Sequence, residues 1–215
     1  MYVICEWDSI AKNNSAFQRS LANLETQVIN KCNVEWAPRR FNAVKALSPD
    51  EGGYGRTTIL PALFADGAGT ALDTTSGGGD PDGTWRLLLT TAGNQTLLQG
   101  ASTGSTISED FKIAWAGLAF PNKNEHISEI KFQIGDRKYG RIDLEVMLSY
   151  NKPAIIFEEG FLLDEETSFH LYGYVEGPIP VAHDQYTGVH QRIVMLGAAY
   201  FKVISKVLGN CAAPI

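Results

Sequence analysis

Alternation of apolar and polar residues dominates the second half of the chain. Three runs alternate almost strictly, at residues 127–134, 141–148 and 169–176. A period of two puts successive side chains on opposite faces of a strand. One face of each run is mostly apolar, which predicts antiparallel strands that are half buried against a second sheet. The side chains expected between the sheets are Ile130, Phe132, Ile134, Ile142, Leu144, Val146, Phe169 and Leu171.

Further apolar runs predict the remaining strands, at residues 41–47, 56–60, 85–91, 95–100 and 111–120. The runs at 85–91 and 95–100 are expected to form a hairpin around Ala92, Gly93 and Asn94. Residues 191–204 are apolar on both faces, which predicts an interior strand or one covered on its outer side. Strands and helices do not alternate, so the pattern favours an all-β, antiparallel two-sheet β-sandwich of the single jelly-roll kind.

The N-terminal region shows helical spacing instead. Its apolar positions on one face are Ile10, Phe17, Leu21, Leu24 and Val28. Asp8 or Ser9 can cap the start of this helix, and Pro38 ends the region. An isolated helix of this length is marginal in water, so its apolar face needs a partner, in its own domain, in a neighbour or in a bundle between subunits. The expected organisation is a helical arm over residues 1–38 and a sandwich over residues 39–215.

Composition narrows the class of protein. The 215 residues are 44% hydrophobic and 20% charged, as in one folded β domain with an arm. The net charge of −6 argues against general binding to nucleic acid. Residues 1–45 carry +2 and the remainder carries −8, so a mildly basic arm adjoins an acidic body. We expect no membrane span and no secretory signal, because no apolar run approaches ~20 residues and the start of the chain lacks a basic region.

Motifs for catalysis and metal binding are incomplete. The four histidines form no HxH or HExxH pair, and no motif for a Ser or Cys nucleophile is present. Asp80 and Asp82 lie in a Gly-rich loop but lack the further ligands that calcium requires. The three cysteines match no metal or disulfide framework, so buried or free thiols are expected at Cys5, Cys32 and Cys211. The expectation is a protein with no catalytic residue, no cofactor and no metal.

Five acidic residues surround a short apolar run at residues 160–163. They are Glu158, Glu159, Asp164, Glu165 and Glu166. Paired carboxylates can act as acid and base in glycosidases, but their position here is typical of the solvated rim of a hairpin. The long loops at residues 66–83 and 177–188 are too long and polar for simple connectors, and we expect them to contact other chains.

His170, Tyr172 and Tyr174 share one face of a predicted strand. Such a face could stack a sugar ring, contact a neighbouring subunit, or simply remain half exposed. Trp85 and Trp115 are further aromatic candidates for sugar stacking.

Four segments of the β region carry a resemblance to a known family. They are KYGRIDLEVM at 138–147, NKPAIIFEEGFLL at 151–163, FHLYGYVEG at 169–177 and QRIVMLGAAYFKV at 191–203. With the preceding helix and the long Gly-, Thr- and Ser-rich loops, the chain resembles the single jelly-roll major capsid proteins of icosahedral viruses of archaea and bacteria, over roughly residues 40–208. None of these segments is a diagnostic motif, because capsid jelly rolls share architecture more than sequence.

The resemblance implies a capsid subunit without an active site, located in the virion after assembly in the host cytoplasm. Its implied partners are copies of itself, as pentamers and hexamers in a shell, with other capsid proteins or an internal membrane as further candidates. One departure is that many capsid proteins have a strongly basic arm, whereas this arm carries only +2. The expected subunit interface consists of Ile10, Phe17, Leu21, Leu24, Val28, Tyr172 and Tyr174.

Two other functions remain open. One is a carbohydrate- or receptor-binding jelly-roll module that uses Trp85, Trp115 or the face with Tyr172 and Tyr174. The other is a β-sandwich glycoside hydrolase. Particle size in solution separates these classes, because only the capsid subunit forms large symmetric assemblies.

Overall fold

The structure is a computed structural model that describes residues 2–5, 15–36, 53–67, 84–121, 126–149, 153–179 and 189–203. Its helices are α2 (Ser15–Glu35), α3 (Glu145–Ser149) and the short 3-10 helix η2 (Pro61–Leu63). Its strands are β1 (Tyr2–Cys5), β2 (Gly53–Thr58), β3 (Phe64–Ala65), β4 (Arg86–Leu89), β5 (Gly93–Gly100), β6 (Phe111–Ala119), β7 (Ile127–Ile134), β8 (Arg137–Lys138), β9 (Ile142–Asp143), β10 (Ala154–Leu163), β11 (Phe169–Val175), β12 (Val189–Arg192) and β13 (Val194–Val203).

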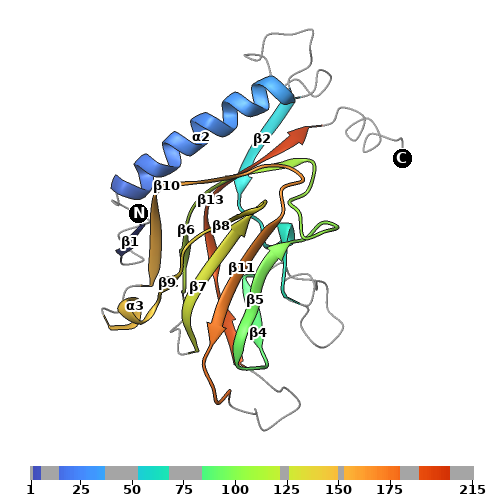
Figure 1. The fold of residues 1–215 in the computed structure, drawn as a ribbon. Coiled ribbons are helices and arrows are strands. Elements are labelled where there is room, and N and C mark those ends of the chain that lie inside the picture. Colours follow the sequence, from blue (N-terminus) through green and yellow to red (C-terminus); the bar gives the residue numbers. More distant parts are fainter. Residues whose placement is uncertain are drawn as a thin grey trace, which may run out of the picture.

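Antiparallel sheets organise these strands (Figure 1). The first large sheet has the order β1-β10-β6-β13-β2. The second has the order β3-β5-β11-β7-β8, and β9 also pairs with β7. Strands β12 and β4 form a small third sheet. The chain repeatedly crosses between the two large sheets, since β5, β6 and β7 alternate between them, as do β10, β11 and β13. The fold is therefore mostly β and antiparallel, as the alternation predicts.

An aromatic cluster fills the space between the two large sheets. Trp115 on β6 is fully buried, and its ring makes edge-to-face contacts with Phe132, Phe157 and Phe169 at 4.8–5.3 Å between ring centroids. Its indole Nε1 donates a hydrogen bond of 2.7 Å to the carbonyl of Gly117. Because Phe132 and Phe169 belong to the second sheet and Phe157 to the first, this cluster joins the two layers.

The predicted core positions are confirmed on the two strands that alternate most clearly. Ile130 and Phe132 on β7, and Phe169 and Leu171 on β11, are all buried. Ile134 is partly buried and packs against the same core. Period-two patterning thus assigned the correct face of both strands.

The strand predicted at 141–148 is wrong over most of its length. Only Ile142–Asp143 is a strand, and α3 begins at Glu145. The carboxylate of Asp143 accepts a hydrogen bond from the backbone N–H of Glu145 at 2.8 Å, which favours a helical turn here. Ile142 and Leu144 are buried as predicted, whereas Val146 is 43% exposed on the helix.

The hairpin predicted between residues 85–91 and 95–100 is also wrong. Both strands exist, but β4 pairs with β12, and β5 pairs with β11 and β3. The side-chain Nε2 of Gln95 donates to the backbone carbonyl and hydroxyl of Thr91. The Gln95 side chain thus occupies Thr91 at the point where the backbone hydrogen bonds of a hairpin would begin.

The apolar segment at 191–204 divides at Ile193 into β12 and β13. Strand β13 lies between β6 and β2, which confirms an interior strand. Both of its faces are apolar because each is covered. Ala199 belongs to the core between the sheets, whereas Ala198 and Tyr200 pack beneath α2.

Helix α2 lies across the outer side of the first sheet, against β10, β6 and β13 (Figure 1). Small side chains beneath it, among them Ala114 and Ala116, allow a close approach. Gly160 on β10 has φ of +66°, and a Cβ there would overlap with Leu24 of the helix. Only glycine accommodates both this backbone conformation and this contact.

Several predictions fall outside the described residues. They concern the strand at 41–47, Asp80 and Asp82 in the Gly-rich loop, Ile10 and Cys211, the helix cap at Asp8 or Ser9, Pro38, and most of the loops at 66–83 and 177–188. Cys32 lies within the described part and is a buried free thiol, as predicted.

Candidate functional site

Three adjacent strands of the second sheet present a polar face away from the core. We call it the tyrosine face, and it consists of Asn94, Thr96, Gln99, Glu129, Lys131, Gln133, His170, Tyr172 and Tyr174. Strand pairing aligns these residues in rows. His170 on β11 lies between Gln99 and Gln133, and Tyr172 lies between Thr96 and Lys131. None of the nine is buried, whereas their neighbours in sequence on β7 and β11 fill the core.

The rings of the tyrosine face are ordered against one another. His170 and Tyr172 are stacked, with 5.7 Å between centroids and 15° between planes. The ammonium of Lys131 lies 5.7 Å from the centre of the Tyr172 ring, within reach of a cation–π interaction. Tyr174 is 42% exposed. Burial lowers the pKa of His170, so this imidazole is neutral at pH 7.

This composition suits hydrated, polar recognition. Amides, hydroxyls and ring edges can form hydrogen bonds with a polar partner, and tyrosines supply contact area at low entropic cost. The nine residues include no aliphatic side chain, whereas the cores of permanent interfaces are apolar and depleted in Lys and Glu. The face includes no residue set for nucleophilic catalysis.

The other aromatic candidates for sugar stacking are not available. Trp115 is fully buried, which makes it wrong as a stacking residue. Trp85 is partly buried and packs on Phe64 at 5.7 Å. Of the predicted aromatic sites, the tyrosine face is the exposed one.

The predicted interface residues of the helix face inward. Leu24 and Val28 are 2% and 0% exposed, because they pack on the protein's own first sheet. Phe17 and Leu21 are partly buried against the same surface. The apolar face of α2 is therefore covered by the protein's own sheet, which was one of the expected partners. A role of α2 between subunits stays a prediction, and it would use the helix's other side.

A buried lysine anchors the C-terminal end of α2 through a group of residues that we call the lysine cluster. The members are Lys31, Glu35, Trp36, Lys112, Asp164 and Glu165. Lys112 on β6 is 0% exposed, and its Nζ lies 2.6 Å from Glu35, 2.5 Å from Asp164 and 3.2 Å from Glu165. The Trp36 ring lies 4.9 Å from the same ammonium, and Lys31 also bonds to Asp164.

The protonation states in the lysine cluster are strongly held. Burial disfavours the charge on Lys112, but the hydrogen bonds that its ammonium donates to Asp164, Glu35 and Glu165 outweigh burial and raise the pKa of Lys112. Burial likewise opposes ionisation of Asp164, but hydrogen bonds from Lys112 and Lys31 lower the pKa of Asp164. The cluster is therefore a charged anchor near neutral pH, with no free base for acid–base chemistry.

The acidic cluster was thus predicted only in part. Glu158, Glu159 and Glu166 are exposed, as expected of a solvated rim. Asp164 and Glu165 are instead partly buried in ion pairs of the same chain. The segment is also not a hairpin, because β10 and β11 belong to different sheets. Lys112 was missed, although alternation places it on the same strand face as Ala114 and Ala116, a small-residue face suited to a covering helix.

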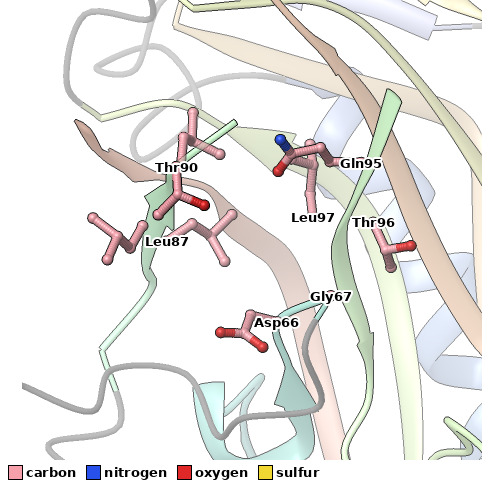
Figure 2. A pocket seen from close by; sticks show the side chains of 9 residues that line it. Asp66, Gly67, Leu87, Thr90, Gln95, Thr96 and Leu97 are labelled. Atoms are coloured by element: carbon pink, nitrogen blue, oxygen red, sulfur yellow. The ribbon is translucent and has the colours of Figure 1, made fainter. Parts of the chain in front are cut away.

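A pocket lies between β4 and β5, where the predicted hairpin fails to form. Its volume is about 350 Å³. Leu87, Leu89 and Leu97 contribute buried aliphatic surface, and Asp66, Thr90 and Gln95 contribute polar groups. Figure 2 shows the side chains of these three polar residues directed toward the space between the two strands. The size is at the lower end of small-molecule sites.

Two further searches concern membranes and metals. Among the residues that the structure describes, no helix is long and apolar enough to cross a membrane. In the same part of the chain, no three His, Cys, Asp or Glu side chains gather as a metal site. The expectation of no metal or cofactor stays a prediction.

No family model, curated protein or solved structure matches the chain. What the protein does is therefore inferred from its strand order and its surfaces.

Proposed function

We propose that the protein is a virion structural protein, a capsid subunit that assembles with copies of itself and has no catalytic activity. The proposal includes a single jelly-roll topology for the sandwich. Its main support is the strand order, with β2-β13-β6-β10 in one sheet and β5-β11-β7-β8 in the other. Jelly rolls are eight-stranded double sheets built from two Greek keys, and viral capsid domains are among their commonest uses.

The individual pairings support this topology. We number β2, β5, β6, β7, β8, β10, β11 and β13 as first to eighth. The first then pairs with the eighth, the eighth with the third, and the third with the sixth. In the other sheet the second pairs with the seventh, the seventh with the fourth, and the fourth with the fifth. Such nesting is what two successive Greek keys produce, because each later strand returns beside an earlier one.

The distribution of surfaces supports assembly through one side. The outer face of the first sheet is covered by α2, whereas the tyrosine face of the second sheet is open in the described part of the chain. Contacts between copies would therefore use the tyrosine face as a polar, hydrated interface, with Tyr172 and Tyr174 on its central strand. Tyrosine is enriched in protein interfaces, and exposed charge pairs at the rim would contribute little, about 0–1 kcal/mol each.

Sedimentation and electron microscopy of the purified full chain test this proposal. We expect concentration-dependent formation of large symmetric particles. Tyr174→Ala should weaken assembly, whereas Val146→Ala should not, because Val146 is similarly exposed but lies on α3, outside the tyrosine face. A chain that remains monomeric at all concentrations and salt conditions, or equal effects of the two variants, would contradict the proposal.

The tyrosine face also favours a second candidate, a glycan-binding jelly-roll module. Amides beside His170 and the exposed ring of Tyr174 are groups that bind sugar hydroxyls and sugar rings. A glycan array with the wild type and Tyr174→Ala distinguishes the two candidates. A monomer with Tyr174-dependent glycan binding would replace the capsid proposal.

The hydrolase alternative has less support. The carboxylates of Asp164 and Glu165 are held by Lys112, and Glu158 and Glu159 are exposed on β10. Retaining and inverting glycosidases need two carboxyls at a fixed separation in a cleft. Within the residues that the structure describes, the acidic cluster offers no such pair.

A further inference from the structure

The pocket between β4 and β5 has an unusual balance of hydrogen-bonding groups. The amide Nε2 of Gln95 already donates to Thr91, so its Oε1 is the atom left to accept from a ligand. The carboxylate of Asp66 contributes further acceptors, and the hydroxyl of Thr90 can accept as well. In Figure 2 Thr90 and Gln95 lie at one end of the pocket, and Asp66 lies at the other end beside Gly67. The side chains of the pocket thus offer mostly acceptors.

The charge of the pocket has one sign. Asp66 is ionisable, and the lining residues within the described part of the chain include no Lys, Arg or His. Asp66 makes another interaction within the chain, but a carboxylate has about four acceptor positions and can bond to more than one donor. The body of the protein is acidic as well, with −8 over residues 46–215. An anionic ligand is therefore disfavoured, and a cationic one is attracted.

The remaining walls are aliphatic. Leu88 is 46% exposed and offers accessible aliphatic surface, whereas Leu87, Leu89 and Leu97 are only 2–3% exposed. None of the lining residues that the structure describes is aromatic. Leucine walls suit a chain of methylene groups, whereas a flat aromatic ligand would find no ring to stack on. A long cationic side chain has this combination, with an apolar stem and a charged end.

We propose that this pocket binds a primary ammonium group carried on an aliphatic stem. The ammonium donates to the carboxylate of Asp66, and the stem packs on the leucines between Asp66 and the end of the pocket that holds Gln95 and Thr90. The same chemistry is found in a free alkylamine and in a lysine side chain of another chain. The site adjoins the tyrosine face, since Thr96 belongs to both, but its ionisable group, Asp66, lies outside that face and can be tested apart from the capsid proposal.

The direct test is titration of the full chain, labelled at leucine methyl groups, with n-butylammonium, while NMR records the methyls of Leu87 and Leu97. We expect saturable shifts with a dissociation constant of about 1 mM, since so small a ligand has few atoms to contribute affinity. Matched probes are 1-butanol, which keeps the stem without charge, and butyrate, which reverses the charge. Both should bind at least about tenfold more weakly, because a charge-assisted hydrogen bond is lost.

Two variants localise the effect. Asp66→Asn should weaken n-butylammonium binding about tenfold or more, whereas Asp136→Asn should leave it unchanged, because Asp136 lies on the exposed turn between β7 and β8. Capped lysine, with both backbone ends neutral, distinguishes the sources. Binding equal to that of the alkylamine favours a lysine side chain, and markedly weaker binding favours a free amine. Absence of saturable shifts, equal shifts with 1-butanol, or no effect of Asp66→Asn would overturn the proposal.

Discussion

Replacing Lys112 with Met should destabilise the protein more than any other single change of a charged side chain in the lysine cluster. Lys112→Met keeps the length and apolar stem of the side chain and removes only the ammonium. That ammonium is 0% exposed and lies within 3.2 Å of Glu35, Asp164 and Glu165. Its removal leaves three carboxylates close together, with Lys31 as the remaining cation beside Glu35 and Asp164 and the Trp36 indole as donor to Glu165.

Two opposing effects set how much unfolding free energy Lys112→Met loses. Breaking a buried ion pair by removing one partner costs about 3–5 kcal/mol, and loss of the cation–π contact with Trp36 adds about 0.5–1 kcal/mol. The carboxylates retain 24–38% exposure, so water solvates part of the charge that is left. We therefore expect the free energy of unfolding to fall by about 2–4 kcal/mol. For a chain of this size each kcal/mol corresponds to about 2–4 °C in Tm.

Urea unfolding, followed by circular dichroism and tryptophan fluorescence, measures this change. Lys138→Met is the matched control, because Lys138 is an exposed lysine on β8, and it should change the free energy of unfolding by less than about 0.5 kcal/mol. Adding Glu165→Gln to Lys112→Met should recover part of the loss, because one repelling charge is removed. A loss below about 1 kcal/mol, or no recovery in the double variant, would show that the cluster does not hold α2 in place.

Three further changes test the packing of α2. Gly160→Ala should cost about 2–3 kcal/mol of unfolding free energy, since its Cβ meets Leu24 and its φ is positive, whereas Gly140→Ala, with open space around it, should be nearly neutral. The pKa of Asp164 is lower in the folded than in the unfolded state, so its contribution to the free energy of unfolding is present above about pH 4 and is lost as the pH falls further. In acid titration the unfolding free energy of Asp164→Asn should therefore decline less steeply than that of the wild type. An identical profile would contradict the ion pairs. Burial raises the pKa of Cys32 to about 12, so at pH 8 the thiol should be alkylated about 1,000-fold more slowly in the folded than in the unfolded protein. Peptide mass mapping measures the two rates. Comparable rates would mean that the helix opens readily.

Sequence patterning identified the sheets where burial differs between the two faces of a strand. Ile130, Phe132, Phe169 and Leu171 alternate with polar residues, and their burial follows directly. The same reasoning failed at residues 141–148, because an alternating run can also turn into a helix when a side chain such as Asp143 accepts from the backbone N–H two residues later. Local hydrogen bonds of this kind are invisible to a periodicity of two.

Long-range pairing could not be predicted from local pattern. The separation of β4 from β5 depends on β12, about a hundred residues later in the chain, and the pocket exists only because the two strands diverge. The lysine cluster likewise joins α2, β6 and the turn after β10. The aromatic row of the tyrosine face was predicted because His170, Tyr172 and Tyr174 lie on one strand, whereas its β5 and β7 members and the other sites come from distant segments and give no local signal.

The pairing of β1 with β10 has a consequence for synthesis. Tyr2 and Cys5 pair with Phe157 and Ala154, and α2 packs on the same late strand. At about 5–20 residues per second, the first 36 residues leave the ribosome roughly 6–25 s before β10 is complete. During this interval the apolar side of the nascent α2 lacks the strand that completes its sheet, so it stays exposed to water. A segment made well before β10 can therefore pack only after β10 is made, and such long-range closure slows folding.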